Sequence, residues 1–328
     1  MKMLKVGLIG CGFMGNTHAN CYKVMDNVEL VAVADLRREK AEMAAKDTNA
    51  VIYSEGMDLI ENADVDIIDV CLPTYLHAEY ALRAMEKVKY LFIEKPVALT
   101  IEQGEALLEK SRETGCQVQV GHVVQFKDEY EELKRLVNSG VYGKVINAAF
   151  RRLSPKPGWG WNDWLLDHKL SGGAGQDLHI HDIDYVLSVF GKPNNFYSVR
   201  NIQGGTNAYV NTLLQYENFV VGVEGTWDLP SSYSFSADFR VVFEKATVEN
   251  AGGKFMLYTN EGASEIKIEK KVSVNSVKGG NLSDLGGHYK ELAYFTERAE
   301  AGEKIERAKL RDSVSSLEFV INELNFGK

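Results

Sequence analysis

The sequence predicts an α/β protein in which an N-terminal parallel sheet precedes a C-terminal α+β domain with a large, open, mostly antiparallel sheet. Over the first 122 residues, strand-like apolar runs alternate with helical patterns, which is typical of parallel βαβ units. From about residue 196 to 271, strand patterns follow one another without helices, which favours antiparallel pairing. Because 328 residues exceed one typical domain, we place a first domain at 1–122 and a second at 123–328.

A glycine-rich turn opens the chain. An apolar strand over residues 6–10 leads into Gly10-x-Gly12-x-x-Gly15, and a helix is predicted over 14–25. Gly10 permits a tight turn, Gly12 lets backbone N–H groups approach a pyrophosphate, and Gly15 lets helix and strand pack closely. The helix N-terminus then offers unpaired N–H groups and its positive dipole end to the phosphates. This pattern predicts a dinucleotide-binding domain of the Rossmann type.

An acidic residue completes this fingerprint. The second predicted strand, 28–35, ends in Asp35, about twenty residues beyond the glycines, as the motif requires. A carboxylate here accepts hydrogen bonds from ribose hydroxyls and repels a 2′-phosphate, so NAD is favoured. Arg37 stands where it would receive that phosphate, so NADP stays open, and Phe13 and Met14 complete the predicted contacts at the helix start. The alternative is an ordinary strand-to-helix turn without a ligand.

The remaining elements follow from hydrophobic periodicity and end signals. Thr100 and Gln103 form a capping box. In the first domain we expect helices over 37–46, 75–87 and 101–114 and strands over 67–72, 90–93 and 117–120. In the second we expect helices over 128–138, 177–190, 285–300 and 307–323 and strands over 145–150, 218–227 and 234–243.

Composition limits the partners. A net charge of −9 and a pI near 5.4 leave no basic surplus for a nucleic acid. No apolar stretch is long enough to span a bilayer, and neither a signal peptide nor a lipidation motif is visible. The four cysteines show no CxxC pairing, so we expect reduced, mostly buried thiols in a cytoplasmic protein.

Two short segments carry candidate catalytic residues. Glu94-Lys95-Pro96 follows a predicted parallel strand, at the sheet edge where ligands bind, and Lys95 there would hydrogen-bond a substrate hydroxyl or the nicotinamide ribose. The alternative is a surface lysine before a turn. Asp177 and His181 are four residues apart on one predicted helix face, and a carboxylate beside an imidazole suits a general base. The alternative is that Asp177 only caps this helix.

A metal site is considered on the same helix. His179 and His181 lie close to Asp182 and Asp184, but residues two apart on a helix point in different directions. No further His or Cys stands at ligand spacing, so we predict no metal here.

Lesser candidates border the expected pocket. Pro73 and His77 follow the strand 67–72 and would border the nicotinamide. Aromatic faces pack well against sugar C–H faces, although each tryptophan is also explained as a loop anchor. His18 on the first helix is equally well explained as a cofactor neighbour or as an ordinary, partly buried histidine. The predicted substrate contacts are His122, Arg152, Trp161, Trp164, Asp177 and His181.

These motifs together resemble the Gfo/Idh/MocA family over essentially the whole chain. The resemblance rests on the glycine turn with Asp35, on Pro73-Thr74-x-x-His77, on Glu94-Lys95-Pro96 and on Gly172-Gly173 followed by Asp177-x-x-x-His181. It implies a Rossmann domain followed by a domain whose open sheet commonly makes dimer or tetramer contacts. It also implies NAD(P)-dependent oxidation of a secondary hydroxyl on a sugar, cyclitol or sugar derivative.

The resemblance assigns roles residue by residue. Lys95 is similar to the family's EKP lysine, Asp177 and His181 to its DxxxH pair with the histidine as general base, and Asp35 to the residue that holds the adenosine ribose. Two positions depart from the family. Gln125-Phe126 stands where an Arg-Phe pair is frequent, and His179 stands where many members have glycine.

The sequence therefore predicts a homo-oligomeric NAD(P)-dependent dehydrogenase acting on a sugar or polyol. Two alternatives remain: a cofactor-binding sensor without turnover, and an enzyme that keeps its NAD bound and oxidises a sugar transiently.

Overall fold

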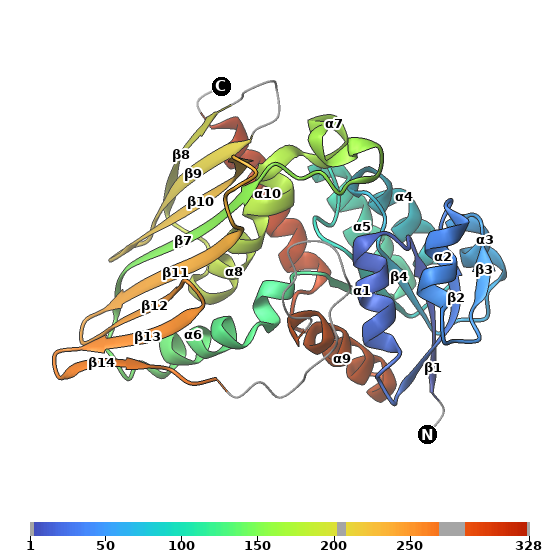
Figure 1. The fold of residues 1–328 in the computed structure, drawn as a ribbon, viewed down its shortest axis with the longest axis horizontal. Helices are drawn as coiled ribbons and strands as arrows, with labels where there is room; N and C mark the ends of the chain where they lie inside the picture. The colour runs from blue at the N-terminus through green and yellow to red at the C-terminus, as the bar shows by residue number, and fades with distance from the viewer. Residues whose placement is uncertain (1–2, 202–207, 269–285, 327–328) are drawn as a thin grey trace. The chain divides into compact units, whose positions relative to one another are not determined.

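The chain divides into two compact units (Figure 1). The computed structural model describes residues 3–201, 208–268 and 286–326. The first unit comprises residues 1–126 and 271–315, and the second comprises 127–270 and 316–328. The first unit thus includes a segment from near the C-terminus, and nothing in the local sequence pattern indicates this return.

A parallel sheet forms the centre of the first unit. Its described strands are ordered β3-β2-β1-β4-β5-β6, and every pair is parallel. The order reverses between β1 and β4, and ligands bind at the carboxyl ends of strands at such a switch point. The strands are β1 (Leu4–Ile9), β2 (Val28–Ala34), β3 (Val51–Tyr53), β4 (Ile67–Val70), β5 (Tyr90–Ile93) and β6 (Gln117–Val120).

Helices cover this sheet. Thr100 caps its helix through the predicted reciprocal bonds with Gln103, and left-handed Gly115 ends it. Leu292 and Phe295 of the returning segment are fully buried in the same hydrophobic cluster as strands β1, β2 and β5. The helices of this unit are α1 (Phe13–Tyr22), α2 (Arg38–Ala45), α3 (Gly56–Asn62), α4 (Thr74–Ala84), α5 (Ile101–Thr114) and α9 (Gly286–Ala301).

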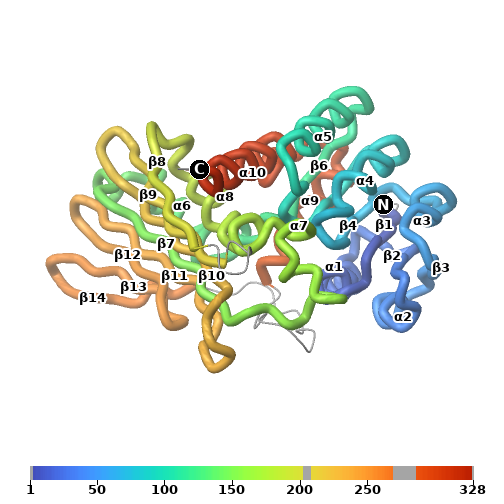
Figure 2. The backbone as a smooth tube through the Cα atoms, turned by 90° about the horizontal axis from the view of Figure 1, so that it is seen from above, coloured from blue at the N-terminus to red at the C-terminus, as the bar shows by residue number. Residues whose placement is uncertain are grey.

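The second unit is built on an open sheet. Its described strands lie in the order β14-β13-β12-β11-β7-β10-β9-β8, which can be followed in Figure 1, and Figure 2 shows the same sheet from above. All neighbours are antiparallel except β7 and β10, which are parallel. The strands are β7 (Val145–Pro155), β8 (Asn195–Asn201), β9 (Tyr209–Gln215), β10 (Val220–Leu229), β11 (Ser236–Phe243), β12 (Thr247–Ala251), β13 (Lys254–Thr259) and β14 (Gly262–Glu265).

Aromatic packing joins the helices of this unit to its sheet. Tyr185 lies 4.8 Å from Tyr130 and 5.8 Å from Phe150, measured between ring centroids. The regular helices are α6 (Asp128–Ser139), the short α7 (His168–Ser171) and α8 (Ile180–Phe190). A further helix, α10 (Leu310–Asn325), begins in the first unit and ends in the second.

The predicted fold class is confirmed, and three local predictions need correction. The helix predicted over 177–190 begins earlier, as a π-helical turn over Gly175–His179 that continues into α8. Asp177 therefore lies inside a helical turn, and the interpretation of this residue as an N-terminal cap is wrong. Strand β7 runs on to Pro155, and the elements β3 and α3 were not predicted. Residue 285, at the predicted start of α9, lies outside the described residues.

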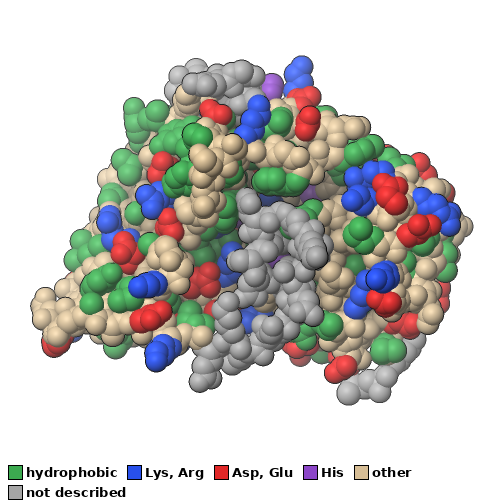
Figure 3. All heavy atoms as spheres, in the orientation of Figure 1, with side chains coloured by type: hydrophobic (Ala, Val, Ile, Leu, Met, Phe, Trp, Pro, Cys, Tyr) green, Lys and Arg blue, Asp and Glu red, His purple; other side chains and the backbone are tan. Residues whose placement is uncertain are grey.

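The described surface mixes both charge signs. Figure 3 shows lysine, arginine and acidic side chains interspersed on the displayed face. This distribution agrees with the absence of a basic surplus in the sequence. Among the described residues, no helix combines the length and the apolar character needed to cross a bilayer.

Candidate functional site

The glycine turn after β1 has the geometry of a phosphate-binding turn. Gly10 has φ +88°, and a Cβ on Gly15 would lie only 1.8 Å from the Gly10 carbonyl oxygen. Neither position therefore accepts a side chain. A Cβ on Gly12 would meet nothing nearer than the Arg37 guanidinium, at 3.8 Å, so the backbone here lies open to a ligand. Helix α1 begins at Phe13, with Met14 in its first turn.

Asp35 lies against this turn. Its carboxylate accepts hydrogen bonds from the backbone N–H of Cys11 and of Arg37, both at 2.8 Å. The Arg37 guanidinium donates two further bonds, at 3.0 and 3.1 Å. The acidic group of the fingerprint is thus held beside the phosphate turn, as a site for an adenosine ribose requires. The turn and Asp35 fit a dinucleotide.

Two loops at the carboxyl edge of the sheet are tied together by His77. This buried imidazole lies 2.6 Å from the Leu72 carbonyl oxygen and 2.7 Å from that of Pro96. It therefore joins the loop after β4, which contains Pro73, to the loop after β5.

Glu94 and Lys95 follow β5 and differ in burial. Lys95 is partly exposed, and its backbone N–H donates to Glu94 Oε2 at 3.1 Å. The Glu94 side chain is buried, with Oε1 3.2 Å from His18 Nε2. Burial alone would raise the pKa of Glu94, but His18, His288 and Lys95 lower it to about 2, so this carboxylate is ionised.

An arginine that sequence reasoning missed lies against Gln125-Phe126. The guanidinium of Arg307, in the returning segment, donates to the Gln125 carbonyl oxygen and lies 4.0 Å from the centre of the Phe126 ring. The neighbouring His122 is buried within the same unit.

In the second unit, the polar residues on the π-helical turn and at the start of α8 differ in exposure. Asp177 and His181 are partly exposed, whereas His179, Asp182 and Asp184 are buried. Each buried group has its own partner. His179 Nε2 lies 3.0 Å from Glu323 Oε1, Asp182 pairs with Arg152, and Asp184 accepts from the Ser316 hydroxyl at 2.9 Å. The exposed pair is the one that the sequence predicts to be catalytic, and π-helical turns are frequent at functional sites.

The predicted substrate contacts in this unit differ in exposure. Arg152 is 3% exposed and donates two hydrogen bonds to Asp182, at 2.8 and 2.9 Å. Trp161, at 41% exposure, and the partly buried Trp164 both lie on the 3-10 segment Trp161–Leu166. Trp164 packs against a cluster that includes Leu165 and Trp227. Of these three side chains, Trp161 is the most exposed.

Family models match both units. Residues 4–122 match an oxidoreductase family model with an NAD-binding Rossmann fold, and residues 130–249 match a GFO/IDH/MocA C-terminal domain. A myo-inositol 2-dehydrogenase of Thermotoga maritima is 30% identical over 58% of this chain and 55% of its own length. A D-glucoside 3-dehydrogenase of Escherichia coli is 29% identical over 70% of this chain and 64% of its own length. The matched region thus spans less than two thirds of either relative.

Solved structures agree with the fold. A levoglucosan dehydrogenase in complex with NADH and levoglucosan superposes with a TM-score of 0.87 at 19% identity, covering 99% of this chain and 97% of its own. The apo scyllo-inositol dehydrogenase of Lactobacillus casei gives 0.79 at 19% identity, covering 98% and 94%. With both units matched in order, and with the glycine turn and Asp35 in place, the chain belongs to the Gfo/Idh/MocA family of NAD-binding oxidoreductases.

Proposed function

We propose that this protein is an NAD(P)-dependent dehydrogenase that oxidises a secondary hydroxyl of a sugar, cyclitol or sugar derivative. The observation that carries the proposal is the open backbone at Gly12 beside the anchored carboxylate of Asp35. The names of the inositol and glucoside dehydrogenases among its relatives support a ring polyol as the substrate class. A cytoplasmic location and a homo-oligomeric state belong to the same proposal.

Three side chains carry the chemistry in this proposal. Bound NAD supplies the acceptor for the hydride that leaves the substrate carbon with its electron pair. His181 takes the proton of the reacting hydroxyl at a ring nitrogen, and Asp177 orients the imidazole and raises its basicity. Lys95 donates a hydrogen bond to the reacting oxygen and stabilises the negative charge that develops on it.

The test is NADH formation, followed by absorbance, from a panel of cyclitols, aldoses, glycosides and sugar acids. We expect turnover of at least one compound by the wild type, and a fall in kcat of about 10²–10⁴-fold in His181→Ala. His168→Ala, which changes an exposed histidine of the same unit, should retain activity. If no compound reduces NAD although the protein binds it, the sensor and bound-cofactor alternatives replace the dehydrogenase.

A further inference from the structure

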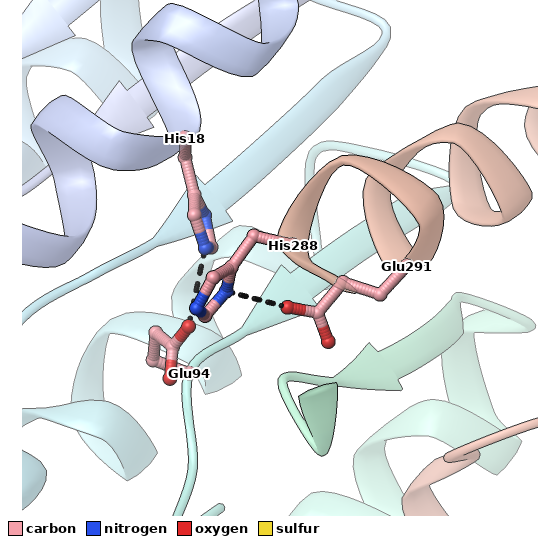
Figure 4. Close-up of side chains that lie close together, drawn as sticks. All are labelled: His18, Glu94, His288 and Glu291. Atoms are coloured by element: carbon pink, nitrogen blue, oxygen red, sulfur yellow. Dashed lines mark hydrogen bonds and ion pairs between the residues drawn. The ribbon is translucent and has the colours of Figure 1, made fainter. Parts of the chain in front are cut away.

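A second cluster of polar side chains lies inside the first unit. His18 comes from α1, Glu94 follows β5, and His288 and Glu291 are three residues apart on α9 (Figure 4). All four are buried, with at most 5% of any of them exposed. Each offers one nitrogen or oxygen atom, and these atoms all lie within 4.8 Å of one another. Such a set of imidazoles and carboxylates is a ligand set for a divalent transition metal.

Carboxylates orient both imidazoles. Asp69 Oδ2 lies 2.8 Å from Nδ1 of His18, and Glu291 Oε1 lies 3.0 Å from Nδ1 of His288. His18 is held as metal-bound histidines typically are, because a hydrogen bond from outside the ligand set at one ring nitrogen fixes the tautomer and aims the other nitrogen. The two ring centroids are 6.1 Å apart, and the ring of His288 lies between Glu94 and Glu291 (Figure 4).

The facing atoms of His18 and Glu94 have the spacing of two ligands that share one ion. Nε2 and Oε1 are 3.2 Å apart, yet neither satisfies the geometry of a hydrogen bond with any described atom. Ligands that are bound to zinc tetrahedrally at about 2.0–2.1 Å lie roughly 3.3 Å from each other. One metal ion could therefore bind both His18 Nε2 and Glu94 Oε1.

The charges of the buried carboxylates also favour a bound cation. Asp69, Glu94 and Glu291 place three carboxylates in the interior, at 0%, 5% and 0% exposure. The Tyr22 hydroxyl, which donates to Asp69 at 2.8 Å, adds no positive charge. Buried carboxylates must be compensated by cations or by protons on their neighbours. A divalent ion bound by the neutral imidazoles, the form that coordinates metal, would supply this compensation in place of positive charge on His18, His288 and Lys95.

We propose that His18, Glu94, His288 and Glu291 form a structural site for one divalent transition-metal ion of the zinc class. Four protein ligands would fill all four positions of a tetrahedral ion and leave none for a substrate. The ion would therefore stabilise the packing of α1 and α9. This proposal is independent of the dehydrogenase activity.

The test uses zinc itself and the full chain. After treatment with a chelator and re-equilibration with Zn²⁺, the metal content of the washed protein is measured by mass spectrometry. We expect about one zinc per wild-type chain and loss of that ion in His288→Gln and in Glu291→Gln. His168→Gln serves as the matched control, because His168 is exposed and lies outside the cluster.

A second readout is thermal. An ion that binds the folded chain raises Tm with concentration, and a concentration 100-fold above Kd is worth about 2.7 kcal/mol. We expect Zn²⁺ to raise the Tm of the wild type and of His168→Gln but not that of a folded His288→Gln. If the wild type holds no zinc, or if the variants hold as much as the wild type, protons on the imidazoles balance the carboxylates and the metal site is disproved.

Discussion

Arg152 and Asp182 form an ion pair with almost no access to water, since their side chains are 4% and 1% exposed. Burial is costly for both charges, so removal of one partner leaves the other uncompensated. We expect Asp182→Asn to lower the free energy of unfolding by about 3–5 kcal/mol. Urea unfolding followed by tryptophan fluorescence measures this loss, because all four tryptophans lie in the second unit.

The matched control for this pair is Asp238→Asn. Asp238 accepts from Arg151, the neighbour of Arg152, but the Arg151 side chain is 51% exposed. Water and salt screen such a pair, so its loss should cost less than about 1 kcal/mol. Equal losses in the two variants would contradict the argument from burial.

Asp35 is the residue that we expect to set the preference for NAD over NADP. Its carboxylate holds Arg37 through two hydrogen bonds and would accept from the ribose hydroxyls of NAD. In Asp35→Ser the negative charge is lost and Arg37 is released toward a 2′-phosphate. A charge-assisted hydrogen bond is worth about 1.5–3 kcal/mol, so we expect the ratio of kcat/KM for NAD over NADP to fall at least tenfold. An unchanged ratio in steady-state kinetics with both cofactors would remove Asp35 from cofactor selection.

The π-helical turn is positioned by its contact with β10. The His179 ring lies against Gly225, where an added Cβ would come within 2.8 Å of the His179 Cβ, and Glu323 of α10 holds the imidazole from its other side. Gly225→Ala must therefore move the turn that carries Asp177. We expect a loss of about 1–3 kcal/mol in stability from overpacking. We also expect a lower kcat with little change in the KM for NAD.

Gly222→Ala is the control for this element. It lies on the same strand, but its added Cβ would meet only Leu213, at an ordinary 3.7 Å. Its kcat and stability should stay close to those of the wild type. If Gly222→Ala and Gly225→Ala lower kcat equally, the strand as a whole is sensitive and the contact with His179 is not responsible.

Local sequence signals predict most elements because each depends on neighbouring residues. The capping box of Thr100 and the glycine turn are complete within a few positions, and both appear as expected. The cluster of His18, Glu94, His288 and Glu291 had no such signal, because its members are brought together only when a distant helix returns to the first unit. The partner of His179 was equally invisible, since Glu323 is more than a hundred positions away.

One face of the sheet of the second unit is exposed, and it carries several large apolar side chains among charged ones such as Arg151 and Arg240. The strand registers place Tyr197, Val199, Leu213, Val220 and Tyr258 on the same side, and each is at least 40% exposed. Alternate residues such as Val210, Leu214 and Val221 point to the other side and are fully buried. A group of large apolar side chains exposed on one face is typical of a protein–protein interface. A second copy of this chain is the partner we expect, because the family resemblance implies dimer or tetramer contacts through the open sheet.

If two copies associate through this face, the mass of the protein in solution should show it. The wild type should have at least twice the monomer mass in light scattering coupled to gel filtration. Tyr197→Asp combined with Leu213→Asp places two charges on adjacent strands at directly paired positions and should yield a monomer. Because both side chains point away from the core, the variant should keep its far-UV circular dichroism.

Arg38→Asp and Glu42→Lys together reverse an exposed ion pair on α2 and should leave the mass unchanged. A wild type that is monomeric at micromolar concentration, or a double aspartate variant that still associates, would show that this face is not the contact between copies.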